Sequence, residues 1–428
     1  MPDPLLEATC NALRPLIPDR DRRAEVARHL RSRLEVLHPP VPLDSKFFDF
    51  EEKVERVLAG FAPSGMTRST LLRMIEHHPP ILSYSPHTLL DHAEAVVTRY
   101  AGEGLTMPDL VRLAQHAPPL LTQRPNTLIR NIETVIEHFQ NHGLTRSAYL
   151  RAAKTHYRLW TQSPARTIGN IESVATHFQP DGVTLEAYLG AALRYPHLFC
   201  RNPSRVQRNI EEVADHFSRS GLTRAAYVAA AIRRAPQLFT QRPATIIANI
   251  EGAVGRYAGD GLTLQSYLTA AIRQPQIFTY RVSTIETNID RVVERFAADG
   301  LTTGVYLRGA VKLPSLICSR PATIIRHVEG IAAMIDEGLL QLPPVFNDVD
   351  SAIARVLAVC RQSPSIYILS DESIALRAEY ARTGDAPRSL VLLKMSRAAI
   401  EEALAKHALP KEGPDPPRDQ AQNEVTDN

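Results

Sequence analysis

Apolar residues recur along most of the chain at spacings of three and four, which is typical of helices that bury one face. In residues 127–139, Leu128, Ile132, Val135 and Phe139 follow one another at spacings of 4, 3 and 4. The same kind of segment recurs at residues 166–178, 205–217, 245–257 and 284–296. The pattern therefore predicts a chain built from amphipathic helices.

A glycine followed by an apolar residue and a threonine marks a tandem repeat. These glycines are Gly65, Gly104, Gly143, Gly182, Gly221, Gly261 and Gly300, and a degenerate junction at Gly338 closes the seventh unit. The intervals between the first seven are 39, 39, 39, 39, 40 and 39 residues. Self-similarity at a fixed period of this length indicates stacked helical units.

Each repeat is predicted to contain two helices, A and B. The threonine after the glycine suits the N-cap of helix A, because its hydroxyl accepts a hydrogen bond from a free backbone N–H. Helix A is expected to end at a proline, namely Pro79, Pro118, Pro196, Pro236, Pro275 or Pro314, with Tyr157 in the third repeat. A second proline suits the first position of helix B: Pro86, Pro125, Pro164, Pro203, Pro243 or Pro321, with Val282 in the sixth repeat.

A helix pair exposes apolar surface that a neighbouring pair can cover. We therefore predict an all-α fold, an α-solenoid of about seven 39-residue helix-pair repeats with N- and C-terminal capping helices. The predicted parts are an N-terminal helical segment at 1–44, an N-terminal cap at 45–64, seven tandem repeats at 65–338, a degenerate eighth repeat with a C-terminal helix at 339–409, and a disordered tail at 410–428. Residues 388–407 are predicted to form one amphipathic helix.

The order of helix A, proline, two apolar residues, a polar turn and helix B resembles the repeat of the mitochondrial transcription termination factor (mTERF) family. Pro196-His197-Leu198-Phe199 and Pro236-Gln237-Leu238-Phe239 carry the resemblance, each followed by a proline and an Ile/Val-rich helix. It covers about residues 65–384 and implies a curved helical array that binds nucleic acid, mainly duplex DNA. The first 30 residues contain five acidic side chains, unlike a transit peptide. We therefore expect a cytoplasmic bacterial relative, with delivery into a host cell as the alternative.

Composition and motifs narrow the function further. The net charge is only +3, so charge placement, and not charge total, has to identify an anionic partner. The four cysteines show no metal-ligand spacing, so we expect the protein to bind no metal ion. The sequence contains no catalytic or dinucleotide-binding motif, so we expect the protein to need no cofactor and not to be an enzyme. Apolar stretches are far shorter than the roughly 20 residues of a membrane span, so we expect no membrane association.

Arginines cluster where helix B should begin, at Arg124, Arg201, Arg242, Arg281 and Arg320. A cation there opposes the helix dipole, whereas free N–H groups beside a guanidinium suit a phosphate. The predicted phosphate-contacting set is Arg124, Arg130, Arg194, Arg201, Arg205, Arg208, Arg242, Arg273, Arg281, Arg320 and Arg326. These residues predict nucleic-acid binding along a basic rim, with DNA favoured over RNA by the resemblance alone.

Three alternatives stay open at this point. The arginines are as readily solvated side chains, and those near the end of helix A, such as Arg194 and Arg273, would complement the helix dipole without any ligand. The competing function is a protein-interaction scaffold that uses a concave surface. A recurrent asparagine in helix B, such as Asn131, is interpreted as structural, because it lies on the inward face and can satisfy backbone groups of a neighbouring unit.

Overall fold

The computed structural model describes residues 4–34, 49–343 and 351–408, and every regular element in those ranges is a helix. This confirms the all-α fold class. The chain divides into two compact units, residues 1–246 and 247–428, and each is described by itself. The predicted disordered tail at 410–428 lies outside the described residues.

Helices A and B form in all seven repeats. Helix A is α4 Arg68–His77, α6 Met107–His116, α9 Arg146–Thr155, α12 Leu185–Arg194, α14 Arg224–Arg234, α16 Leu264–Arg273 and α18 Thr303–Lys312. Helix B is α5 Pro86–Tyr100, α8 Pro125–Phe139, α11 Pro164–His177, α13 Pro203–His216, α15 Pro243–Tyr257, α17 Val282–Arg295 and α20 Pro321–Asp336.

The predicted boundary signals act as expected. The threonine before each helix A, for example Thr184 before α12, accepts a hydrogen bond from the backbone N–H three residues later. Each of the seven junction glycines that start a repeat has a φ between +75° and +90°, a conformation that favours glycine. Helix B begins at its proline in six repeats and at Val282 in the sixth, because proline is favourable at that position but not required.

The segment between helices A and B is itself helical, which the sequence pattern did not predict. These short turns are η3 Pro79–Ser83, α7 Pro119–Thr122, α10 Arg158–Thr161, η7 Pro196–Cys200, η9 Pro236–Phe239, η11 Pro275–Thr279 and α19 Ser315–Cys318. In four repeats the proline that ends helix A is also the first residue of this turn, because its fixed φ is compatible with a first helical position. Pro118 and Pro314 instead directly precede the turn as its N-cap. Each repeat has at least three helical segments, because the first five repeats also have a 3-10 turn after helix B: η4 Ala101–Glu103, η5 Gln140–His142, η6 Gln179–Asp181, η8 Ser218–Ser220 and η10 Ala258–Asp260.

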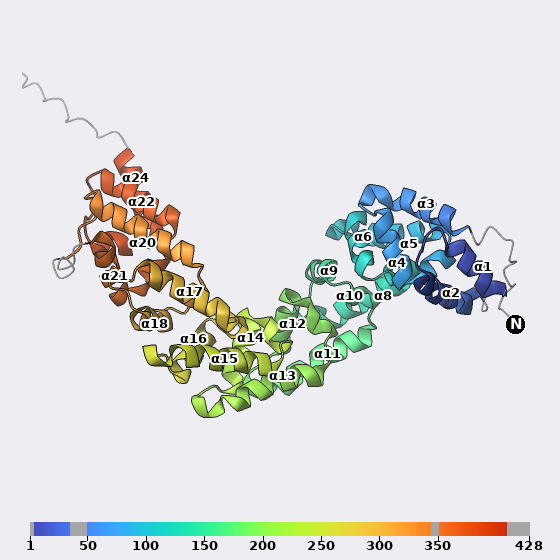
Figure 1. Cartoon of the computed structure of the whole chain (residues 1–428), viewed down its shortest axis with the longest axis horizontal. Helices are drawn as coiled ribbons and strands as arrows, with labels where there is room; N and C mark the ends of the chain where they lie inside the picture. The colour runs from blue at the N-terminus through green and yellow to red at the C-terminus, as the bar shows by residue number, and fades with distance from the viewer. Residues whose placement is uncertain (1–3, 35–48, 344–350, 409–428) are drawn as a thin grey trace, which may run out of the picture. The chain divides into compact units, whose positions relative to one another are not determined.

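Successive repeats pack like against like within each unit (Figure 1). In the first unit α5 packs on α8, α8 on α11 and α11 on α13, while α6, α9, α12 and α14 form a second row. In the second unit α16 packs on α18 and α17 on α20. Aromatic rings join the rows: Tyr149 of α9 lies edge-to-face on Phe199 of the next turn, with ring centroids 5.3 Å apart, and Tyr188 does the same with Phe239.

The ends of the chain depart from the repeat. Helices α1 Pro4–Leu13, α2 Arg20–Leu34 and α3 Phe50–Phe61 precede the repeats. After them, α21 Ala352–Gln362, η13 Pro364–Ile368 and α22 Asp371–Arg382 keep the order helix, turn, helix that was predicted for the degenerate eighth repeat.

The prediction of a single helix at residues 388–407 is wrong. The structure has two helices, α23 Leu390–Lys394 and α24 Arg397–Ala408, with Met395 extended between them. The buried Arg377 of α22 explains the break, because its guanidinium donates to the carbonyl oxygens of Leu392 at 3.0 Å and Met395 at 2.5 Å. Those carbonyls would otherwise be free to accept hydrogen bonds from a continuing helix.

Candidate nucleic-acid interface

The arginines directly before helix B are exposed. Arg124, Arg281 and Arg320 are the N-cap residues of α8, α17 and α20, and Arg242 directly precedes α15. In the described part of the chain none of the four guanidinium groups makes an ion pair or a hydrogen bond. A backbone N–H row and a solvated cation thus lie together at each of these helix starts, as a phosphate-binding site requires.

Arg201 differs from the other members of this set. It lies one residue earlier, because Asn202 is the N-cap of α13 and its side chain accepts a hydrogen bond from the N–H of Arg205 at 3.2 Å. Arg201 is half-buried and lines a pocket that is described below. Its guanidinium has no ion-pair partner among the described residues.

The arginines inside helix B fall into two groups. Arg130 and Arg205 are exposed, and no side chain of the described ranges pairs with them. Arg208 lies 3.9 Å from Glu212, a loose pair on an exposed face. Arg326 forms a two-pronged ion pair with Asp371, with N–O distances of 2.8 and 2.6 Å, so a phosphate would have to displace that carboxylate.

The two arginines at the ends of helix A also differ. The guanidinium of Arg194 donates to the carbonyl oxygen of Ile232 near the end of α14, so it stabilises the neighbouring repeat. Arg273 is exposed and, within the described residues, has no partner. Of the predicted set, Arg194 and Arg326 therefore have structural partners, whereas most of the others point only to solvent.

A pocket of about 360 Å³ lies at the turns of repeats two to four. It is lined by His116, Thr155, His156, Tyr157, Arg158, His197, Cys200 and Arg201. No carboxylate lines it. Of these residues, the sequence pattern singles out Arg201 but not Arg158, His156 or His197; the one signal in the sequence is that Tyr157 replaces the usual proline in this repeat.

Burial and neighbouring charges favour the neutral form of two of the pocket histidines, His156 and His197. His156 is 9% exposed, and its burial, followed by the charges of His197, Arg158 and Arg201, lowers its pKa from 6.5 to about 4. The pKa of His197 is lowered by burial, Arg201 and Arg158. Burial raises the pKa of the Cys200 thiol to about 11, so it carries no charge near pH 7. Arg158 and Arg201 are therefore the permanently charged groups that line the pocket.

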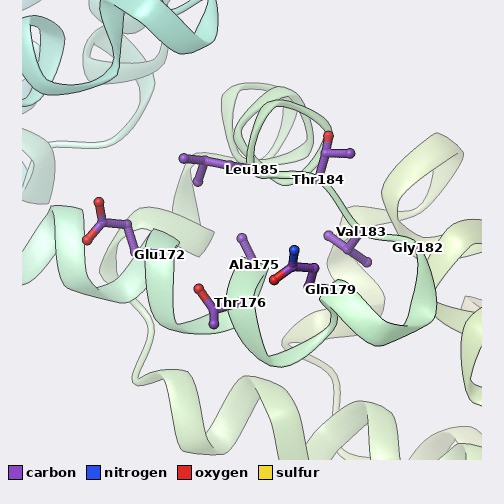
Figure 2. A pocket seen from close by; sticks show the side chains of 8 residues that line it. All are labelled: Glu172, Ala175, Thr176, Gln179, Gly182, Val183, Thr184 and Leu185. Atoms are coloured by element: carbon purple, nitrogen blue, oxygen red, sulfur yellow. The ribbon is translucent and has the colours of Figure 1, made fainter.

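A larger pocket, of about 560 Å³, lies at the opposite end of helix B (Figure 2). Ala175 and Thr176 of α11 face Thr184 and Leu185 at the start of α12, and Glu172 lies at one end. Glu172 accepts a hydrogen bond from His138 at 2.7 Å. No lysine or arginine lines this pocket, so it is unsuited to a phosphate.

The recurrent asparagines are structural, as the sequence indicated. The side-chain N–H groups of Asn131, Asn170, Asn209 and Asn288 each donate to a turn carbonyl of the following repeat, those of Trp160, Phe199, Phe239 and Ile317, at 2.8 to 3.0 Å. His92 and His327 hold the equivalent places at the ends of the row. These amides join neighbouring repeats and are not available to read bases.

A second recurring set of structural contacts, formed by ion pairs between successive B helices, was not predicted from the sequence. The end of one helix B pairs with the middle of the next, always 34 residues later: Arg99–Glu133, His138–Glu172, His177–Glu211, Arg256–Asp290 and Arg295–Glu329. Two acids at the junctions, Glu103 and Asp181, likewise face Arg146 and Arg224. The junctions are therefore partly charge-balanced.

No other chemistry stands out. Within the described ranges, no three His, Cys, Asp or Glu side chains are grouped so that they could hold a metal ion. No described helix combines the length and the hydropathy that crossing a membrane requires. Compared with models of known protein families and with curated protein sequences, the chain gives no match.

Proposed function

We propose that the helical repeats stack as an α-solenoid and that the chain binds nucleic acid through backbone phosphates along its turn edge, without catalysing a reaction. The turn edge comprises Arg124, Arg130, Arg205, Arg242, Arg273, Arg281 and Arg320. The observation that carries the proposal is that these recurring arginines are exposed and have no partner among the described residues, while the arginines near the C-terminal ends of helix B, Arg99, Arg256 and Arg295, are paired.

An arginine fixed beside the free N–H groups of a helix start adds a guanidinium fork to a local positive potential. Phosphate contacts of this kind position a duplex or a single strand without reading its bases. The proposal therefore includes weak sequence discrimination. The proposal favours duplex DNA over RNA only because the repeat resembles that of the mTERF family.

The experiment is a fluorescence-anisotropy titration of the full chain with duplex DNA and with RNA at several salt concentrations. We expect salt-dependent binding of the wild type. Changing Arg242, Arg281 and Arg320 together to Gln should weaken binding and flatten the log–log salt slope, by about 0.9 per lost contact on B-DNA or about 0.7 on a single strand.

A charge-matched control changes three arginines that are already paired, Arg256, Arg295 and Arg382, to Gln. This control removes the same net charge, so it isolates the contribution of position. Its salt slope should stay close to that of the wild type. Equal slopes for the two triple variants, or no salt-dependent binding of either nucleic acid, would reject the proposal.

A further inference from the structure

In three repeats the residue that ends helix A is polar and forms a hydrogen bond with the next repeat. His78 Nε2 lies 2.9 Å from the Thr122 hydroxyl, and the Thr240 hydroxyl donates to the Tyr195 hydroxyl at 3.3 Å. Gln274 forms the equivalent hydrogen bond with Cys318 in the second unit. In each case a polar side chain from the end of one helix A is satisfied by the turn that follows helix A of the next repeat.

His156 breaks this regularity. It holds the same place at the end of α9, and the equivalent turn position in the next repeat is Cys200. Yet its Nε2 atom is buried and has no hydrogen-bond partner. A buried imidazole nitrogen without a partner is costly, so it is expected to have one in the functional state of the molecule.

The surroundings of His156 indicate what kind of partner is missing. His156 lines the 360 Å³ pocket together with Arg158 and Arg201. Neither guanidinium has an ion-pair partner in the described parts of the chain, and Asp and Glu are absent from the lining. The His197 ring lies 4.3 Å from the His156 ring, between centroids, and adds a further polar edge.

We propose that this pocket is a binding site for a phosphate ester, with Arg158, Arg201 and His156 as its ligands. Two guanidinium groups and a ring nitrogen together offer more donors than a planar carboxylate can use, whereas the oxygens of a tetrahedral phosphate can accept from all three. The volume is within the range of small-molecule pockets, which begins at roughly 300 Å³, so part of the esterified group also fits.

Two sources could supply the phosphate ester: a free phosphorylated metabolite, or the terminal phosphate of a nucleic acid. The second source rests on the proposed function, whereas the first does not. The site lies entirely within residues 1–246, so the inference does not depend on how the two units are arranged.

The test is isothermal titration calorimetry of the full chain with adenosine 5′-monophosphate, and with adenosine as the unphosphorylated control. We expect binding of the monophosphate only. Arg158→Gln should weaken it by about tenfold or more, because a charge-assisted contact is lost. Arg158 is exposed, so the melting temperature of this variant should be unchanged.

His156→Gln is the second variant, because glutamine naturally stands at this position in the sixth repeat as Gln274. Its amide can bond Cys200 as Gln274 bonds Cys318, which removes the free donor and keeps the fold. We expect a several-fold loss of affinity. Arg291→Gln, at an exposed position of α17 outside both the pocket and the turn edge, is the matched control and should bind like the wild type.

A second arm compares one single-stranded DNA dodecamer with and without a 5′-phosphate. If the phosphorylated strand binds more tightly and Arg158→Gln abolishes that difference, the site recognises the ends of nucleic acids. If the monophosphate binds but the 5′-phosphate has no effect on the dodecamer, the site recognises a free metabolite. If the dodecamers bind equally and the monophosphate does not bind, the pocket proposal fails while the proposed function stands. Monophosphate binding that neither pocket variant weakens would also overturn it.

Discussion

Polar side chains recur at the repeat period in two places, and the two sets have opposite environments. The inner set, represented by Asn131 and Glu133 of α8, reaches into the neighbouring repeat and is fully engaged there. The outer set, represented by Arg124 and Arg130 of the same helix, is exposed, and its side chains form no hydrogen bond or ion pair with the described residues. Periodicity in the sequence is the same for both, so recurrence alone does not distinguish a structural residue from a binding residue.

The difference follows from what each position can reach. A turn carbonyl of the next repeat lies within 3.0 Å of the amide of each of Asn131, Asn170, Asn209 and Asn288, so those side chains are held by the stacking of repeats. The helix-start arginines have only their own solvated helix end beside them. The inner set should therefore govern stability, and the outer set should govern binding.

His156 is an inner residue whose Nε2 atom lacks a hydrogen-bond partner, and it should produce the largest effect. Its folded pKa of about 4 lies below the ordinary 6.5, so the unfolded chain takes up a proton before the folded chain does. Its contribution to stability is complete above about pH 6.5 and is lost as the pH falls towards 4, by on the order of 3 kcal/mol. His197, Arg158 and Arg201 face it and disfavour its protonation.

The measurement is urea unfolding of the wild type and His156→Gln between pH 8 and pH 4. Because glutamine does not titrate, the variant should lose less stability than the wild type across this range. Acid-sensitive groups elsewhere are common to both proteins and cancel in the difference. Parallel stability curves would show that His156 is protonated as easily in the folded chain as in the unfolded one.

Asn131→Leu should have the next largest effect. Leucine fills the space but leaves the carbonyl oxygen of Trp160 without its 2.8 Å hydrogen bond, at a cost of about 1–3 kcal/mol of unfolding free energy. Asn126→Leu, at an exposed position of the same helix, is the control and should change stability by less than about 0.5 kcal/mol. The free energy of unfolding of both variants is measured by urea titration. Equal losses of unfolding free energy would show that the inner and outer faces of α8 do not differ in their contribution to stability.

Changing Arg124 and Arg130 together to Gln should have the smallest effect on stability. Both side chains are exposed and unpaired in the described structure, so each substitution should cost less than about 0.5 kcal/mol. Affinity for nucleic acid should fall all the same. The melting temperature is measured by circular dichroism. A lowered value would show that these arginines contribute to the packing between repeats and belong to the inner set.

Signals that act within a few residues made much of the fold predictable. Thr184 caps α12, Gly182 takes a left-handed φ before it, and Pro164 begins α11, each as the sequence indicates. The break at Met395 was not predictable in the same way. It depends on hydrogen bonds from Arg377, a residue 18 positions earlier whose burial no local pattern reveals.

The sequence by itself determined the repeat period, helices A and B with their boundaries, and the arginines that stand before helix B. Only the tertiary structure decided which charged residues are partnered, since pairs such as Arg326–Asp371 and Arg99–Glu133 join residues 45 and 34 positions apart. It also decided that His156, alone among the polar helix A ends described above, has an unsatisfied nitrogen in a pocket with two arginines. The physical reason is that caps and periodicity act within one helix, whereas partnership and burial depend on how one repeat is packed on the next.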